Sequence, residues 1–341
     1  MKPTILLTWA TGYIGSHTAV EFIEAWYEVI IVDNLANSHV KTLEWIEKIT
    51  GVLPKFYECD LRDRERLEDI FKHHTFDCVI HFAGLKAVGE SCEKPLEYFD
   101  NNIVWSLRLF ECMEKYDVQK LIFSSSATVY DPVNFESWAW VSESGTTGET
   151  TNPYGTTKYL VERIMRDIAA FSNMQIINLR YFNPIWAHPS GYIGEYPDDY
   201  PNNLLPYVMK VACGELPYLN VFGDDYNTVD GTGVRDYIDV CDLATAHFKA
   251  YSSLDWVSWG NIEHYNLWTG TGTSVLELIK IASEIKGSEI DYKIVDRRPW
   301  DIGQVFCDPR KAEEKLWWKA ETLTTESVKN SYLFSKNILW S

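Results

Sequence analysis

Short apolar runs alternate with amphipathic stretches along the first half of the chain. We interpret the runs as strands, and they lie at residues 5–8, 29–32, 55–60, 78–84, 121–123 and 176–181. Between them, apolar residues recur at helical spacing, most clearly over 14–23, 62–73, 95–116 and 154–168. This alternation predicts a parallel, doubly wound sheet with right-handed crossovers, which is a Rossmann-type α/β fold.

A loop interrupts the alternation, and the pattern loosens beyond the strand at 176–181. Residues 131–151 are rich in Ser, Gly, Thr and Glu and predict a surface loop, and a Gly-Thr-Gly turn at 270–272 precedes a helix at 275–286. We expect a nucleotide-binding domain over 1–183 and a smaller, mixed α/β substrate-binding region over 184–341. Parts of the second region can return to the first domain. Ligands commonly lodge between two such regions.

Composition and charge narrow the class of protein. The 341 residues are 46% hydrophobic and carry a formal net charge of −18, so we expect no nucleic-acid partner. The seven cysteines form no CxxC pair, which is typical of a reduced, cytoplasmic protein. No apolar run approaches membrane-spanning length, and the eight histidines show no metal-binding spacing, so we expect neither a membrane partner nor a metal.

The turn between the first strand and the first helix carries the first candidate chemistry. Gly12 lets phosphates approach the backbone and Gly15 lets helix and sheet pack closely, while the helix N-terminus favours a pyrophosphate. The second strand ends in Asp33, which would accept hydrogen bonds from an adenosine ribose and repel a 2′-phosphate. Asp60 and Leu61, after the third strand, would meet the adenine. The sequence predicts NAD as the cofactor; the alternative is an ordinary tight turn.

The second candidate site lies where a helix opens near residue 153. Tyr154 and Lys158 are one helical turn apart and project from the same face. A lysine ammonium near a phenol favours the phenolate, and the positive nicotinamide ring would add to this effect, so we expect the pKa of Tyr154 to move toward neutrality. The hydroxyl of Ser126, at the end of the fifth strand, would share the substrate proton. These three residues predict alcohol oxidation with hydride transfer to NAD; the alternative is a solvated helix face.

Six segments give the chain a resemblance to a known family: residues 11–18, 81–91, 124–130, 181–184, 202–207 and 231–238. With them the chain resembles, over almost its full length, the extended short-chain dehydrogenases/reductases, and in particular the UDP-hexose 4-epimerases. The resemblance implies epimerisation at C4 of UDP-glucose and UDP-galactose through a transient 4-keto sugar. Ser126, Tyr154 and Lys158 would be catalytic, the partner would be a UDP-sugar, and the protein would be a homodimer.

The resemblance also assigns binding residues. The cofactor residues would be Gly12, Tyr13, Ile14, Gly15, Asp33, Asn34, Asn37, Ser38, Asp60, Leu61, Phe82, Ala83, Gly84, Lys86, Asn101, Ser124, Tyr154, Lys158 and Tyr181. The substrate residues would be Ser126, Tyr154, Asn183, Asn203, Leu204, Asn220, Val221, Phe222, Arg235, Arg298, Asp301 and Val305. Arg235 and Arg298 would clamp the diphosphate, which suits a planar, bidentate donor. For Arg298, the alternative is a surface arginine.

Val305 is the residue that the resemblance places beside the C2 substituent of the sugar. A small valine there predicts that UDP-N-acetylglucosamine and UDP-N-acetylgalactosamine also fit, because no bulky side chain excludes the acetamido group. The alternative is that Val305 packs in the core and Phe306 fills the space.

Six tryptophans stand at positions where the family has glycine: Trp9, Trp26, Trp186, Trp268, Trp300 and Trp317. We predict that most of these residues are glycines in the organism, because some bacteria read the codon UGA as glycine. An indole at position 9 would crowd the glycine turn and the pyrophosphate position. The alternative is a divergent relative that binds nucleotides without turnover. Smaller departures are Ala10 for a glycine and Asp239 where the family usually has histidine.

A second enzymatic alternative is a nucleotide-sugar dehydratase or decarboxylase. Such an enzyme needs a further acid and base near the end of the fifth strand. Residues 126–128, Ser-Ala-Thr, offer no Asp-Glu pair, so the sequence favours the epimerase.

Overall fold

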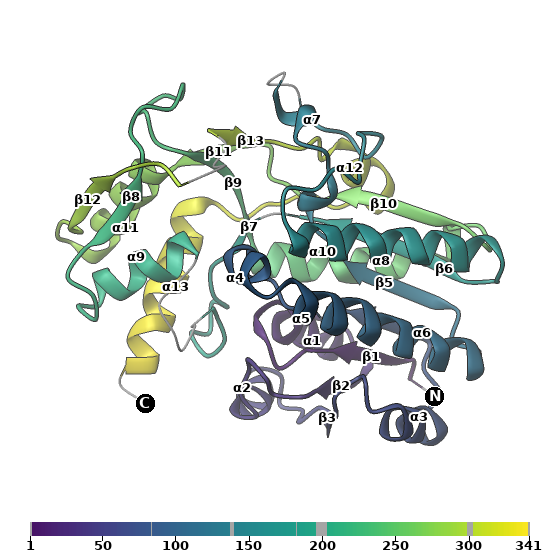
Figure 1. Cartoon of the computed structure of the whole chain (residues 1–341). Helices are drawn as coiled ribbons and strands as arrows, with labels where there is room; N and C mark the ends of the chain where they lie inside the picture. Colours follow the sequence, from purple (N-terminus) through teal and green to yellow (C-terminus); the bar gives the residue numbers. More distant parts are fainter. Residues whose placement is uncertain are drawn as a thin grey trace.

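A single parallel sheet forms the centre of the protein. The structure is a computed structural model that describes residues 2–82, 84–136, 140–181, 183–195, 203–298 and 303–339. The sheet has seven strands in the order β10-β6-β5-β4-β1-β2-β3, and every strand pair in it is parallel (Figure 1). The strands are β1 (Thr4–Thr8), β2 (Glu28–Asp33), β3 (Lys55–Glu58), β4 (Cys78–His81), β5 (Lys120–Ser124), β6 (Gln175–Arg180) and β10 (Ile262–Asn266). The predicted Rossmann-type fold is confirmed, and a strand from the C-terminal half completes the sheet.

Helices cover both faces of the sheet, as Figure 1 shows. One apolar core unites the strands with α1 (Tyr13–Glu24), α2 (Lys41–Thr50), α10 (Val240–Ser253) and α12 (Arg310–Leu316). A second core, on the other face, includes α3 (Arg64–His73), α6 (Trp105–Lys115) and α8 (Pro153–Ala170). The short elements are α4 (Val88–Glu93), α5 (Pro95–Phe99), the 3-10 turns η2 (Ala127–Val129) and η3 (Leu254–Trp256), and α7 (Val133–Glu136).

The helix predicted over 95–116 is interrupted. A π-helical turn, η1 (Asp100–Val104), separates α5 from α6. The apolar residues expected on one side of this helix do not all reach the core: Leu96 is 82% exposed and Leu107 is 38% exposed, whereas Phe110 is buried. The α5–α6 segment therefore presents part of its apolar side to the surroundings.

A second lobe, at the left of Figure 1, packs three helices against two small sheets. One sheet joins β7 (Asn183–Ile185), β9 (Val234–Asp239), β11 (Gly272–Ser274) and β13 (Gln304–Val305), and the other joins β8 (Leu219–Phe222) and β12 (Tyr292–Val295). The helices are α9 (Leu204–Ala212), α11 (Val275–Lys286) and α13 (Thr324–Leu339). The predicted helix at 275–286 is confirmed, and it begins at Ser274 with a capping box.

Four tryptophans have the left-handed backbone conformation that favours glycine. The φ angles are 58° at Trp9, 69° at Trp26, 95° at Trp186 and 48° at Trp317. A bulky residue is strained there because its Cβ approaches the backbone too closely. The backbone at these four positions therefore supports the prediction that they are glycines.

Two of the four stand at helix ends, where the same chain elsewhere uses glycine. Trp26 follows α1, and Trp317 caps the C-terminus of α12. Gly51 and Gly287 end α2 and α11 in the same way, with φ angles of 73° and 81°. A left-handed residue after the last turn is the usual way to satisfy the terminal carbonyls of a helix, and glycine adopts it without strain.

The other expectations about tryptophan have different outcomes. The Trp9 indole is only 9% exposed and packs edge-on against Trp105, with ring centroids 4.5 Å apart. It therefore enters the core on the α6 face, and the expectation that the indole crowds the glycine turn is wrong, since the Trp9 atom that approaches Gly12 and Gly15 is its carbonyl oxygen. Its encroachment on the pyrophosphate position stays a prediction. Trp268 is buried, and its φ is not among the left-handed ones, so its backbone makes no demand for glycine. Trp300 lies outside the described residues.

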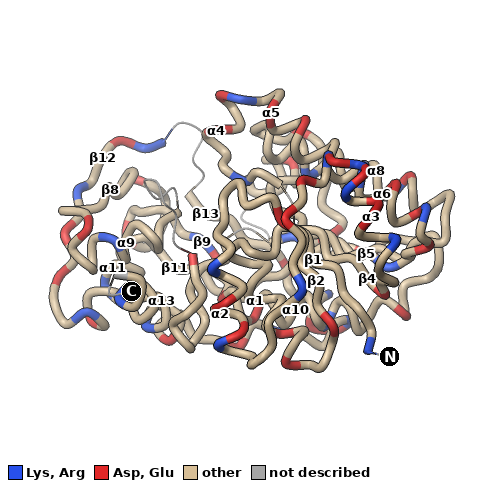
Figure 2. The backbone as a smooth tube through the Cα atoms, turned by 90° about the horizontal axis from the view of Figure 1, so that it is seen from below, with Lys and Arg blue, Asp and Glu red and all other residues tan. Residues whose placement is uncertain are grey.

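The surface carries charges of both signs. Figure 2 shows Lys and Arg interspersed with Asp and Glu over the outer helices and loops. All seven cysteines are free thiols, and Cys59, Cys78, Cys112 and Cys307 are buried. Among the described residues, no helix combines the length and the apolar character that crossing a bilayer requires.

Candidate active site

The turn after β1 is shaped by close contact between its two ends. A Cβ atom at Gly15 would lie 2.4 Å from Ala10 Cα and 2.9 Å from the Trp9 carbonyl oxygen, so no larger residue fits there. Gly12 is the N-cap of α1, and Tyr13 and Ile14 open the helix. The first N–H groups of α1 therefore point out of a narrow turn at the carboxyl edge of the sheet, which is suited to an anionic group.

Asp33, at the end of β2, is buried and faces this turn. Its Oδ2 accepts a hydrogen bond from Thr11 N at 3.1 Å, and its Oδ1 accepts from Leu35 N at 2.9 Å and Ser38 Oγ at 3.2 Å. These bonds hold the carboxylate beside the glycine turn, as the predicted hydrogen bonding of Asp33 to an adenosine ribose requires. Asn37 lies on the same loop and is exposed.

Asp60 forms the centre of a polar cluster on the neighbouring strand end. It accepts hydrogen bonds from Asn34 Nδ2 at 3.1 Å, from the Arg62 guanidinium at 2.8 Å and from Trp105 Nε1 at 2.8 Å. Burial alone would raise the pKa of Asp60, but the hydrogen bonds from Arg62 and Asn34 outweigh it and lower the pKa to about 2. Leu61, beside it, is buried. The predicted adenine-side residues are thus held together as a preformed anionic corner.

The three predicted catalytic residues converge where β5 ends against the first turns of α8. The hydroxyls of Tyr154 and Ser126 share a hydrogen bond. Ser126 Oγ also accepts from Thr128 N at 3.2 Å, which fixes its rotamer. Lys158 Nζ donates to the Ser124 carbonyl oxygen at 2.8 Å and lies 4.7 Å from the centre of the Phe123 ring. The side chains that would handle a proton are therefore preorganised.

The pKa values in this cluster differ from the expectation. Burial raises the pKa of Tyr154 to about 12, against a smaller lowering by the Ser126 hydrogen bond. Burial lowers the pKa of Lys158 to about 7, against an opposing effect of Glu162. The predicted shift of Tyr154 toward neutrality is therefore wrong for the protein's own groups, because Lys158 bonds to a backbone carbonyl and desolvation dominates the phenol.

The other predicted cofactor residues surround this cluster. Gly84 has a φ of 154°, and a Cβ there would lie 3.4 Å from Lys158 Nζ, so the turn after β4 approaches the lysine closely. The hydroxyls of Ser124 and Tyr181 are hydrogen-bonded to each other. Asn101 is buried within η1. The half-buried Phe82 packs against His247, and Ala83 lies outside the described residues.

Two of the predicted binding residues, Lys86 and Asn203, are both hydrogen-bonded to Glu195. Glu195 Oε1 accepts hydrogen bonds from Lys86 Nζ at 3.0 Å and from Asn203 Nδ2 at 2.7 Å. Leu204 follows Asn203 as the first residue of α9. The Nδ2 of Asn183 is buried and has no hydrogen-bond partner among the described residues, which marks it as a donor available to a ligand.

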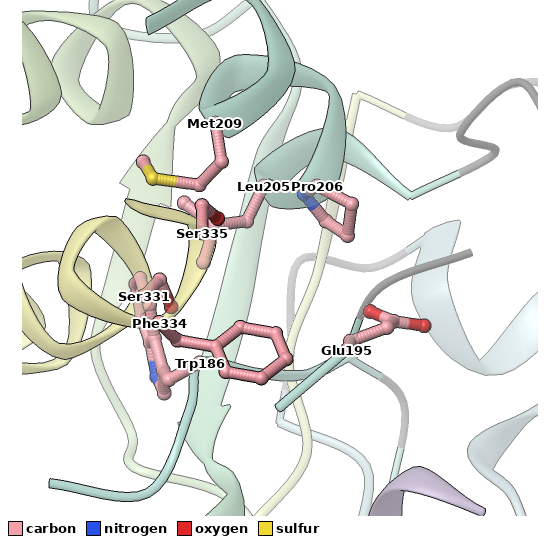
Figure 3. A pocket seen from close by; sticks show the side chains of 8 residues that line it. All are labelled: Trp186, Glu195, Leu205, Pro206, Met209, Ser331, Phe334 and Ser335. Carbon is pink, nitrogen blue, oxygen red and sulfur yellow. The ribbon is translucent and has the colours of Figure 1, made fainter. Parts of the chain in front are cut away.

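A small cavity lies beside Glu195. It is lined by Trp186, Glu195, Leu205, Pro206, Met209, Ser331, Phe334 and Ser335, between α9 and α13 (Figure 3). Its volume of about 10 Å³ admits one water at most. Since Trp186 has a left-handed backbone and lines this cavity, a glycine at position 186 would enlarge it.

The predicted uracil and diphosphate residues lie in the second lobe. Asn220, Val221 and Phe222 form the end of β8, where Val221 is buried while its two neighbours are half-buried. The Arg298 guanidinium lies 4.1 Å above the Phe222 ring, so the exposed arginine is held at the end of β8. Arg235, on β9, donates from Nη1 to the Val234 carbonyl oxygen at 2.9 Å. Asp301 lies outside the described residues.

Val305 and Phe306 point to opposite sides of β13. The buried Val305 belongs to a cluster with Tyr130, Val141, Trp268 and Cys307, which also holds the segment that follows Ser126. Phe306 instead contacts Gly272 and lines a separate groove beside α11. The burial of Val305 in this cluster agrees with the first part of the alternative, that Val305 packs in the core, whereas Phe306 lies elsewhere and does not fill the space around it.

Sequence reasoning missed several buried polar residues behind the site. Asn102, in η1, accepts from Leu85 N at 2.7 Å and donates to Thr157 Oγ1 at 2.8 Å, so it ties the turn after β4 to α8. Glu162 and Arg180 form a buried ion pair. The available signal was spacing, because Glu162 follows Lys158 by one helical turn.

Comparisons with known proteins place the chain in a family. The family model for GDP-mannose 4,6 dehydratase matches residues 6–331. The UDP-glucose 4-epimerase of Bacillus subtilis (strain 168) is 49% identical over 329 residues, which cover 96% of this chain and 95% of that protein. The crystal structure of UDP-glucose 4-epimerase from Bifidobacterium longum in complex with NAD+ and UDP is 48% identical, with a TM-score of 0.92 over 98% of both chains.

A further solved structure agrees over the whole length. The UDP-glucose-4-epimerase from Stenotrophomonas maltophila, with bound NAD and formylated UDP-arabinopyranose, has a TM-score of 0.94 at 43% identity and covers 99% of both chains. The chain therefore belongs to the extended short-chain dehydrogenase/reductase family, and within it to the UDP-glucose 4-epimerases.

Proposed function

We propose that the protein is a NAD-dependent 4-epimerase of UDP-hexoses. The observation that carries the proposal is the cluster of Ser126, Tyr154 and Lys158, built at the same sheet edge as the glycine turn and Asp33. Two solved relatives with this fold hold NAD, one with UDP and one with a UDP-sugar. A hydroxyl, a phenol and a buried amine at a nucleotide edge are the groups that reversible alcohol oxidation needs.

The chain's own residues fit the cofactor. The narrow turn at Gly15 leaves the N-terminus of α1 free for the pyrophosphate, and Asp33 lies within hydrogen-bonding distance of the same turn. NAD, when bound, would supply a reversible hydride acceptor for C4 of the sugar. Asp33 and the Asp60 corner would hold the adenosine end.

Tyr154 is the proposed base. In the forward direction its oxygen takes the proton of the sugar 4-hydroxyl while C4 is oxidised to a carbonyl, and in the return step it gives the proton back. Ser126 orients both oxygens through its hydrogen bond to Tyr154. Lys158, as an ammonium, stabilises the phenolate form that must exist between the two transfers. The reaction is redox-neutral overall.

The UDP part of the substrate would bind to residues of the second lobe. Phe222 and Arg298 are already in contact, and Asn183 has a free donor close to β9, with which β7 pairs. Arg235 and Arg298 would hold the diphosphate, and Asn220 the uracil. Val305, on the side of the Ser126–Tyr130 segment, would set the space for the C2 substituent, so we include UDP-N-acetylhexosamines as substrates.

A homodimer is the proposed assembly. Helix α5 packs against α8, and Leu96 on α5 and Leu107 on the following α6 are exposed, while Ile164 and Ile168 on α8 are half-buried against the core. Burial of such an apolar face against a second copy would be favourable. The seven free cysteines support a cytoplasmic location. Sedimentation equilibrium tests the assembly, and a monomer at micromolar concentration would contradict it.

Incubation of the purified protein with UDP-galactose, followed by chromatography of the products, tests the function. Two versions are needed, the chain as written and a variant with glycine at positions 9, 26, 186 and 317. Formation of UDP-glucose without net NADH supports the proposal. A second candidate, nucleotide binding without turnover, follows if the indole at Trp9 is genuine; it would hold if the tryptophan version binds NAD without converting substrate while the glycine variant converts it.

A further inference from the structure

The end of β5 and the start of α8 meet through a ladder of polar contacts. Tyr154, Lys158 and Glu162 follow one another at single helical turns and lie on one face of α8. Opposite them stand three consecutive serines. The Ser124 carbonyl oxygen accepts from Lys158 Nζ at 2.8 Å, and Ser126 shares a hydrogen bond with Tyr154.

The middle serine of the three, Ser125, contacts Glu162, which is the last of the three helix residues and lies outside the catalytic cluster. Ser125 Oγ donates to Glu162 Oε1 at 2.5 Å, and both side chains are buried. One serine meets one residue of α8 at each step, so the register of the strand end against the helix is fixed three times. A shift of Glu162 would therefore move the serines on both sides of Ser125.

Glu162 is itself clamped from the opposite side. Arg180, on β6, donates from Nε to Glu162 Oε1 at 3.0 Å and from Nη2 to Oε2 at 2.6 Å. Arg180 also donates from Nη1 to the Tyr130 hydroxyl at 3.0 Å. A buried ion pair is often no more stabilising than packed apolar residues, so stability alone does not account for it. What the bidentate geometry provides is a fixed orientation for the carboxylate.

The Glu162 charge also acts on the catalytic lysine. Burial lowers the pKa of Lys158 to about 7, and Glu162 opposes this lowering. The other titratable groups near Lys158 are Tyr154 on α8, His81 on β4 and Tyr181 after β6. His81 is neutral, since burial lowers its pKa to about 3, and Arg180 is paired with Glu162 itself. His264, on β10, lies 3.6 Å from Glu162 Oε2, and burial lowers its pKa to about 4, so it is neutral as well.

We propose that Glu162, oriented by Arg180, is a positioning residue for epimerisation: it holds Ser125, and through it the Ser126–Tyr154 pair, and its charge favours the ammonium form of Lys158. This inference rests on the proposed function. No contact between Glu162 and the substrate or cofactor is involved.

The test compares Glu162→Gln and Ser125→Ala with Asp167→Asn, an exposed charge change on the same helix. Glu162→Gln should lower kcat for UDP-galactose about tenfold or more with little change in KM, as loss of an aligned proton-transfer group does. Because the carboxylate favours the Lys158 cation, its removal should also shift the alkaline limb of the kcat profile to lower pH. Asp167→Asn should leave both unchanged.

Ser125→Ala separates alignment from charge, since it leaves the ion pair in place. Ser125→Ala should lower kcat several-fold without moving the alkaline limb of the pH profile. Circular dichroism and NAD content show whether Glu162→Gln is folded, and if it is not, the Ser125→Ala result alone tests the inference. Wild-type kcat in a folded Glu162→Gln protein, or in Ser125→Ala, would overturn the inference. An inactive wild-type protein would instead refute the proposed function.

Discussion

Trp26 offers a direct measurement of the backbone strain. It follows the last turn of α1 with a φ of 69°, its N–H donates to the Ile23 carbonyl oxygen at 3.0 Å, and its indole is 75% exposed. Little apolar burial is therefore lost when the side chain is removed. A left-handed conformation costs an L-residue roughly 1–2 kcal/mol, and glycine avoids this strain but gives up more chain entropy on folding, by roughly 0.5–1 kcal/mol.

Comparison of glycine with alanine isolates this backbone effect, because both substitutions remove the indole and its contact with Lys2. We expect Trp26→Gly to be more stable to unfolding than Trp26→Ala by about 1 kcal/mol, or about 1–2 °C in a chain of this size. The matched control is Trp256, which is 62% exposed in η3 and has no left-handed φ. There alanine should be the more stable of the two by about 0.5–1 kcal/mol.

Scanning calorimetry with chemical denaturation measures both pairs. If Trp26→Ala equals or exceeds Trp26→Gly in stability, or if the two sites respond with the same sign, then the left-handed backbone imposes no preference for glycine. The argument at Trp9, Trp186 and Trp317 would fail with it.

Four other outcomes are expected. Tyr154→Phe should lose about a hundredfold or more of turnover while retaining NAD, and near-normal activity would reject Tyr154 as the base. Val305→Tyr should abolish turnover of UDP-N-acetylgalactosamine and spare UDP-galactose; equal effects on both substrates would exclude Val305 as the gate. Burial raises the pKa of Asp239 to about 6, so its protonated form is favoured by folding and stability falls as the pH rises from about 4 to 6. Asp239→Asn should therefore stabilise the protein at pH 7.5, by at most about 3 kcal/mol, and much less at pH 4; equal effects at both values would contradict this reasoning. Mass spectrometry of the protein from its native cells should find glycine at position 9, and an indole there would refute the recoding hypothesis.

The local elements were predictable because their signals are local. The strand at β1, the helix α11 with its Ser274 cap, and the Tyr154–Lys158 pair all follow from periodicity and spacing within a few residues. The π-helical turn η1 did not follow, because an inserted residue in a helix leaves the apolar pattern nearly intact.

The parts that escaped prediction depend on contacts between distant segments. A glutamate in a helix is usually solvated, so the spacing of Glu162 one turn after Lys158 did not by itself show that its side chain would be buried against Arg180. The pKa of Tyr154 depends on how fully the phenol is desolvated and on where Lys158 Nζ points, and both are set by β5 packing on α8. Residue spacing placed the groups together but could not give the sign of the shift.

The pairing of β10 with β6 also governs how the chain is made. Strand β6 ends at Arg180, and its partner begins at Ile262, about 80 residues later. At roughly 5–20 residues per second, β6 waits about 4–16 seconds on the ribosome with an apolar edge unpaired. Every residue of β6 is buried in the finished protein. Synthesis that stalls within this interval would release a chain prone to edge-to-edge association, so yield should depend on translation speed between these two strands.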